Sequence, residues 1–266
     1  FFDFVGGLSL PFDFFDLLPD EFLDFDFGLL PFVAGGSVTI EGGTFSDTDG
    51  NVYNGNIYSQ TAGIVIEGIA GDINIIAHDN GSDIQTTDVS GNDEIGVVLY
   101  DIAANTTIED ATITGNYGEG LDVDNAYDLT IANTTVEGNN GFGLWVTNVE
   151  DVIFTDNIVQ SNFLAVLLTG AESVIVNDGL YAENDYTGIA LNAVKTNLTM
   201  TGTIIRDNGT YGLWLTDDEN VNISQVTSSG NDIGVYVKDY LPQFELTNSF
   251  ITGNRVGVQV GELLIN

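Results

Sequence analysis

The sequence predicts an all-β solenoid in which three short strands per coil stack into three parallel sheets. One observation is a repeat that recurs every 22 to 24 residues from Gly96 onward. The other is that no ten-residue segment after residue 34 keeps the 3.6-residue apolar period of a helix. With about 23 residues in each coil, residues 35–266 form about nine to ten coils.

Each repeat opens with a small residue followed by an apolar–any–apolar triplet, which is the pattern of a short strand. The aligned small residues are Gly63, Gly96, Gly120, Gly143, Ala165, Gly188, Gly212, Gly234 and Gly257. A second strand follows, as in Leu129–Ile131, and then a shorter third one, as in Thr135–Val136. One coil cannot bury these apolar faces by itself, so we expect the coils to stack around a continuous interior.

Asparagines recur at a fixed place in the repeat. Four residues before the aligned small residue lie Asn92, Asn116, Asn139, Asn184 and Asn208. Two interpretations are open: stacked amides that hydrogen-bond from coil to coil, or residues present only because Asn favours turns.

The period breaks once, since Gly63 and Gly96 are 33 residues apart. The excess predicts a loop at residues 77–83 that projects from the solenoid. It contains His78, the only histidine, so a mechanism that needs two imidazoles is excluded.

The composition divides the chain near residue 34. Residues 1–34 hold ten of the sixteen Phe, seven acids and no base. We expect a Phe-rich acidic cap or docking segment at 1–34 and a parallel β-helix domain at 35–266.

The Asn–x3–Gly–apolar–x–apolar units resemble the right-handed parallel β-helix repeat of pectate-lyase-like proteins, over about residues 36–266. The resemblance implies a single-stranded right-handed helix. It does not extend to the family's enzyme motifs: the Gly-His-Gly and Arg-x-Lys of polygalacturonases and the Asp-Pro-His of alginate epimerases are absent. The resemblance therefore predicts fold and not activity.

Charge excludes some partners and favours one location. Forty Asp and Glu against four Lys and Arg give a net charge of −36, which excludes nucleic-acid binding. No apolar run is long enough to span a membrane, and there is no cysteine. Because such a charge needs abundant counterions, we expect an extracellular or cell-surface protein.

One coil carries two acids on the outward face of its first strand. Asp122 and Asp124 lie about 6.6 Å apart by strand rise, and Glu119 lies just upstream. That separation suits the acid and base of an inverting glycosidase. Acidic pairs are expected anywhere in a chain with forty acids, so we predict no catalytic residue and keep these three as the alternative.

The same outward column forms an apolar stripe along the solenoid. It contains Trp145, Leu167, Trp214 and Tyr236, beside the hydroxyls of Thr147 and Thr216. Aromatic rings flanked by hydrogen-bonding groups suit a glycan or a protein partner. The alternative is a face covered by another segment of the same chain.

No cofactor is required by the sequence, and calcium is the one ion left open. Asp47, Asp49 and Asn51 offer oxygen ligands at alternate positions, but Val52 stands where an EF-type loop has Gly.

The two ends of the solenoid are candidate docking surfaces. Apolar side chains gather near the first coil at Phe12, Phe15, Leu23, Phe25 and Phe27, and after the last at Leu263, Leu264 and Ile265. The first group either caps its own coil or packs on the open end of a neighbouring copy. The second arrangement is head-to-tail and would build a filament.

We therefore expect a non-catalytic extracellular structural or adhesive subunit, which assembles head-to-tail into a filament or surface fibre. The alternative is a polysaccharide-active enzyme (a glycoside hydrolase or polysaccharide lyase) or a glycan-binding, tailspike-like module. The expected partners are a second copy of the chain or a cell-surface polysaccharide.

Overall fold

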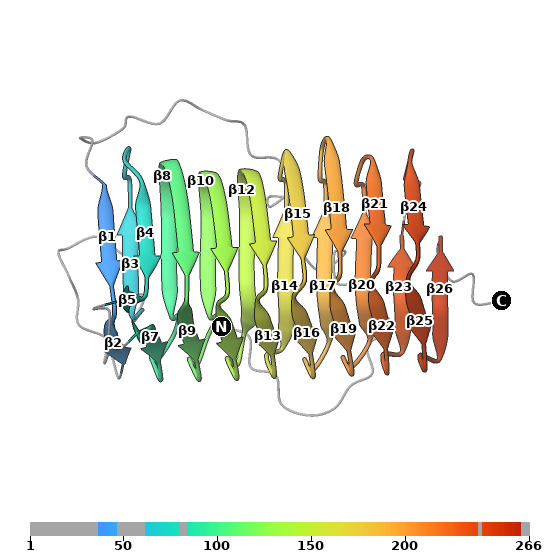
Figure 1. Ribbon diagram of the computed structural model, residues 1–266, viewed down its shortest axis with the longest axis horizontal. Coiled ribbons are helices and arrows are strands. Elements are labelled where there is room, and N and C mark those ends of the chain that lie inside the picture. The colour runs from blue at the N-terminus through green and yellow to red at the C-terminus, as the bar shows by residue number, and fades with distance from the viewer. Residues whose placement is uncertain (1–36, 47–61, 80–83, 239–240, 262–266) are drawn as a thin grey trace. The chain divides into compact units, whose positions relative to one another are not determined.

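The chain forms the predicted parallel β-solenoid (Figure 1). The computed structural model describes residues 37–46, 62–79, 84–238 and 241–261. Every regular element in these ranges is a β-strand. None of them contains a helix long and apolar enough to cross a membrane.

Three ladders of parallel strands run along the solenoid. The first ladder contains β3 (Ile64–Glu67), the opening parts of β8 (Val97–Glu109), β10 (Leu121–Ala132) and β12 (Phe142–Thr155), then β14 (Leu164–Thr169), β17 (Thr187–Asn192), β20 (Tyr211–Thr216), β23 (Ile233–Val237) and β26 (Val256–Val260). The second contains β1 (Val38–Glu41), β4 (Ile73–Ile76), the closing parts of β8, β10 and β12, then β15 (Ser173–Asn177), β18 (Asn197–Thr201), β21 (Val221–Ser224) and β24 (Phe244–Thr247). The third contains β2 (Gly43–Ser46), β7 (Thr87–Ser90), β9 (Ala111–Thr114), β11 (Thr135–Glu137), β13 (Ile158–Gln160), β16 (Leu180–Ala182), β19 (Ile204–Arg206), β22 (Thr227–Ser229) and β25 (Phe250–Thr252).

Single residues in the left-handed backbone region turn the chain at its corners. β8, β10 and β12 bend from the first ladder into the second at Asp101, Asn125 and Asn148, where φ is 55°, 58° and 53°. Asp and Asn tolerate this region better than other residues that carry a Cβ. The bend keeps these strands continuous, so the first two ladders form one 15-stranded sheet within the described residues.

The interior is a stack of aligned apolar side chains, as predicted. Leu121 pairs with Leu144, Leu144 with Val166, and Leu213 follows two coils later; all four are 0% exposed. The small residue before each is required because its Cβ points inward. At Gly120 a Cβ would lie 2.7 Å from the carbonyl oxygen of Gly143 and 2.8 Å from Nδ2 of Asn139.

The asparagines form a continuous amide ladder, so the first of the two interpretations is confirmed. The ladder runs through Asn92, Asn116, Asn139, Asn162, Asn184, Asn208, Asn231 and Asn254, and each Nδ2 donates to the next Oδ1 at 2.8–3.4 Å. The backbone N–H of each also donates to the same oxygen, as Asn116 N does to Asn139 Oδ1 at 3.0 Å. Three members, Asn162, Asn231 and Asn254, lie three residues before the aligned small residue and not four, which hid them in the sequence pattern.

The break in the period is an antiparallel hairpin outside the ladders. β5 (His78–Asp79) pairs with β6 (Ile84–Gln85). His78 Nδ1 lies 2.9 Å from Oε1 of Glu41, and both side chains are exposed. The only imidazole of the chain is thus held on the surface at the first described coil.

Replacing one amide of the ladder should destabilise the fold. Asn139→Ala leaves the backbone N–H and Nδ2 of Asn116 without their acceptor in a buried site, and Asn162 Oδ1 loses one of its donors. Unsatisfied buried donors cost about 1–3 kcal/mol each. We expect the free energy of unfolding to fall by about 2 kcal/mol or more in urea titrations followed by circular dichroism. Asn222→Ala, at an exposed outward position of β21, is the control and should change it by less than about 0.5 kcal/mol. Equal effects of the two variants would contradict the role of the ladder.

Candidate functional site

The outer face of the first ladder brings most of the predicted site residues together. Asp122 pairs with Trp145, Trp145 with Leu167, Leu167 with Ala190, Ala190 with Trp214, and Trp214 with Tyr236. Thr147 and Thr216 lie in the neighbouring outward column, with Thr169 and Asn192 between them.

Much of this stripe is not exposed, which corrects the expectation from the sequence. Leu167 and Trp214 are 1% exposed and Tyr236 is 5% exposed, and Thr216 is also buried. Trp145 and Thr147 are half-buried. The buried stripe residues do not belong to the interior core, so the outside of this ladder carries a second buried apolar layer. Trp214 is packed by Tyr211, with ring centroids 4.8 Å apart, and by Tyr236 at 5.6 Å.

A row of aromatic rings runs along this outer face, and the sequence pattern did not reveal it. We call it the ring row; in order along the face it contains Trp145, Phe142, Phe163, Tyr186, Tyr211, Trp214 and Tyr236, with neighbouring centroids 4.8–6.2 Å apart. Phe163 and Tyr186 are stacked with 6° between their planes. Four of the rings stand one or two positions before the aligned small residue, and this recurrence was the signal that could have found them.

The ring row is partly open to solvent over its first five members. Phe163 is 39% exposed, and Trp145, Phe142, Tyr186 and Tyr211 are half-buried. Thr187 lies on the same face, between Leu164 and Tyr211 in register. Its hydroxyl is fully buried and has no hydrogen-bond partner. The Thr187 hydroxyl therefore lies beneath this face, and the part of the ring row that solvent reaches is mainly apolar.

Three carboxyl groups stand at the Trp145 end of the ring row. Glu119, Asp122 and Asp124 are half-buried, and the Asp124 carboxylate accepts hydrogen bonds from Thr147 Oγ1 at 2.7 Å and Asn148 Nδ2 at 3.2 Å. Burial, followed by the charges of Glu119 and Asp124, raises the pKa of Asp122 to about 7. Burial and the charge of Glu94 raise the pKa of Glu119, against a lowering backbone hydrogen bond. The three carboxyl groups are therefore crowded together, and Asp122 is mostly ionised only above about pH 7.

A buried carboxyl group, that of Asp218, lies at the Trp214 end of the ring row. Trp214 Nε1 donates to Thr216 Oγ1 at 2.8 Å, and Asp218 Oδ2 accepts from the Thr216 backbone N–H at 3.2 Å. Asp218 Oδ1 accepts from the Val194 N–H at 2.9 Å, and its side chain is fully buried. Burial raises the pKa of Asp218 to about 8, although the two backbone donors lower it.

The raised pKa of Asp218 should make stability fall as the pH rises. A carboxyl with a folded pKa above its unfolded value holds its proton more tightly in the folded state. Its stabilising contribution is greatest below about pH 4 and is lost towards pH 8. In urea titrations from pH 5 to 8, Asp218→Asn should remove a slope of up to about 1.4 kcal/mol per pH unit. The exposed Asp93→Asn is the control and should keep the wild-type slope; a wild-type slope in Asp218→Asn would refute the assignment.

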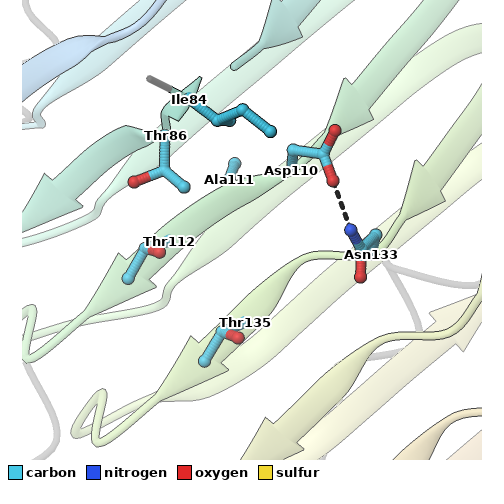
Figure 2. A pocket seen from close by; sticks show the side chains of 7 residues that line it. All are labelled: Ile84, Thr86, Asp110, Ala111, Thr112, Asn133 and Thr135. Atoms are coloured by element: carbon cyan, nitrogen blue, oxygen red, sulfur yellow. Dashed lines mark hydrogen bonds between the residues drawn. The ribbon is translucent and has the colours of Figure 1, made fainter. Parts of the chain in front are cut away.

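A shallow pocket of about 300 Å³ lies on the outside of the third ladder, beside the hairpin (Figure 2). It is lined by Ile84, Thr86, Asp110, Ala111, Thr112, Asn133 and Thr135, and Asn133 Nδ2 donates to the Asp110 carboxylate (Figure 2). It offers hydroxyls and one paired carboxylate, but no histidine or cysteine nucleophile or base.

Several predicted positions lie outside the described residues. They are the calcium candidates Asp47, Asp49 and Asn51 and the end-docking residues Phe12, Phe15, Leu23, Phe25, Phe27, Leu263, Leu264 and Ile265. Within the described ranges, no group of three or more His, Cys, Asp and Glu side chains could hold a metal ion.

Two solved structures that match the chain are the A-modules of mannuronan C-5 epimerases from Azotobacter vinelandii. The AlgE6 module is 13% identical with a TM-score of 0.50, over 88% of this chain and 77% of that one. The AlgE4 module is 13% identical with a TM-score of 0.36, over 85% and 89%. At this identity, the AlgE6 likeness concerns the fold alone. No curated protein matches the chain.

A family model described as periplasmic copper-binding protein (NosD) matches residues 150–263. The side chains do not fit a copper site. Copper prefers His, Met and Cys ligands. The chain has one His, one Met and no Cys. His78 is next to Glu41, and Met200 is fully buried in the interior.

A second family model, described as right handed beta helix region, matches residues 32–180, which is more than half of the chain. The match agrees with the three parallel ladders and the 23-residue coils described above. The chain therefore belongs to the right-handed β-helix family.

Proposed function

We propose that this chain is an extracytoplasmic β-helix that binds polysaccharide on the outer face of its first ladder. The observation that carries the proposal is the ring row, whose first five members are partly exposed in an unbroken series. Sugar rings have apolar faces that pack on aromatic rings, and hydroxyls that need hydrogen-bonding partners at the edge.

The polar column beside the ring row supplies such partners. Thr147 and Thr169 are half-buried and present hydroxyls in consecutive coils, whereas Asn192 in the next coil is buried. Neighbouring strands are about 4.8 Å apart, so these groups repeat along the face at a fixed spacing. A regular surface of this kind suits a polymer that repeats one unit.

Two further observations support a place outside the cytoplasm. The family model that matches residues 150–263 is described as periplasmic. A net charge of −36 keeps a protein soluble where counterions are plentiful, at the cost of self-repulsion.

Removing rings from the solvent-accessible part of the ring row should weaken polysaccharide binding. In affinity electrophoresis through gels that contain a panel of soluble neutral and acidic polysaccharides, the wild-type chain should be retarded by at least one of them. Phe163→Ala and Tyr186→Ala should each weaken that retardation about 5- to 10-fold, because each removes a stacking surface. The matched controls are Phe250→Ala, on the third ladder, and Tyr127→Ala, at a corner; both rings are exposed away from the row and should leave binding unchanged.

No retardation by any polysaccharide, or equal losses in the controls, would refute the proposal. Release of reducing ends or of unsaturated uronate that Asp122→Asn abolishes would instead make the chain an enzyme of the glycoside hydrolase or polysaccharide lyase type.

End-to-end assembly is a second candidate function, and it rests on the last described coil. Val258 and Val260 pair with Val235 and Val237 and so occupy inward positions, yet they are 44% and 70% exposed. At the opposite end, Val38, Ile40 and Phe45 face the interior and are only half-buried. Both surfaces are apolar, so each could cover the other, and their strands could pair edge to edge. This supports head-to-tail stacking of copies into a filament.

A charge on the last described coil should stop such assembly. Val258→Lys and Val260→Lys should abolish any concentration-dependent rise in light scattering, because both would bury a charge at the junction. Val65→Lys, which is exposed on the outer face of β3, is the control and should scatter as the wild type does. Wild-type scattering that stays at the monomer value over a hundredfold range of concentration would refute this candidate.

A further inference from the structure

The charges around the ring row select among polysaccharides. The strands of the first ladder carry no Lys or Arg in the described part of the chain. Lys238 follows directly after β23, five coils away from Asp124, or about 24 Å at the spacing of parallel strands. Lys195 lies beyond the corner that follows β17, and Arg255, directly before β26, pairs with Asp232, directly before β23. The exposed part of the ring row thus begins next to three carboxyl groups and has no cation among its strands.

The carboxyl groups already repel one another. Glu94 acts on Glu119, and both Glu119 and Asp124 act on Asp122. Trp145 is the direct strand neighbour of Asp122, and Phe142 packs edge-on against Trp145 at 5.4 Å. A ligand that lies over these two rings therefore lies over the carboxyl groups as well.

We infer that the polysaccharide bound by this face is uncharged and not a polyuronate. The inference rests on the proposed function and names the substrate class of the same face. A polyuronate carries one carboxylate on every sugar, so above about pH 7, where Asp122 is ionised, it would bring a row of negative charges against Glu119, Asp122 and Asp124. Like charges a few ångströms apart repel strongly in a half-buried site. A neutral hexose polymer presents a hydroxymethyl group at the same place and avoids this repulsion.

The test uses ligand pairs that differ only at C6. Mannohexaose is compared with the hexamer of mannuronate, and cellohexaose with the hexamer of glucuronate, all β-1,4-linked. Binding is measured by calorimetry in EDTA at low ionic strength, so that divalent ions cannot bridge carboxylates and salt does not screen them. We expect a neutral hexamer to bind at least tenfold more tightly than its acidic partner, with the ratio shrinking at high salt.

Charge-removing variants test the cause. Glu119→Gln combined with Asp122→Asn should reduce the preference to about threefold or less, mainly by improving the acidic ligand. Asp124 is kept because it holds Thr147 and Asn148 in place. The control is Glu219→Gln with Glu245→Gln, which removes two exposed charges off the face and should retain the full preference.

The outcomes separate the two proposals. Acidic hexamers that bind as tightly as the neutral ones, or more tightly, would overturn this inference and leave the proposed function standing. A preference unchanged in the Glu119 and Asp122 variant would also overturn it, since the charges named would not be its cause. No binding by any of the four hexamers, together with no retardation by any polysaccharide of the panel, would overturn both.

Discussion

The stacking of identical positions from coil to coil is the constraint on which the whole structure depends. Each inward Leu or Val is buried by the residue one coil before and one coil after it, as Leu121 is by Leu144. The amide ladder imposes the same rule on polar groups, since the Oδ1 of one Asn satisfies two donors of its neighbour. No coil can shift by one residue without turning its apolar side chains outward and breaking these bonds. The stability of the fold is therefore approximately a sum of contacts between neighbouring coils. Changes at the inward positions of a coil are poorly tolerated.

The same constraint explains which features the sequence could predict. A residue type that every coil needs is repeated, so Gly120 or Leu121 is recognised from its counterparts. The ladder members Asn162, Asn231 and Asn254 escaped because the turn after them is one residue shorter, which moves an amide in the sequence without moving it in space. Phe163 and Tyr186 were not predicted for a related reason. A ring on the outer face is not required in every coil, so these rings do not form a regular repeat in the sequence.

Exposure was the property that the sequence predicted least well. Period-two alternation correctly puts Leu167 and Trp214 on the outside of the ladder, and they are nevertheless buried. An outward direction says only that a side chain leaves the interior, whereas burial depends on what else packs there; for Trp214 this includes Tyr211 and Tyr236. The environment of Asp122 was equally hidden, because its raised pKa comes from burial and from carboxyl groups that the fold brings close.

The amide ladder also has a direction. From Asn116 to Asn254, each Oδ1 accepts a side-chain N–H from the amide of the preceding coil, so all these oxygens point back along the chain. The other side-chain hydrogen bonds of these amides go to backbone carbonyls, as from Asn116 Nδ2 to Val89 O. Peptide-like amides have dipoles of about 3.5 D, and dipoles aligned head to tail add instead of cancelling. The amide ladder thus carries a net dipole along the solenoid, with its positive end towards β26 and its negative end towards β3. The formal charges of the same molecule are almost all negative.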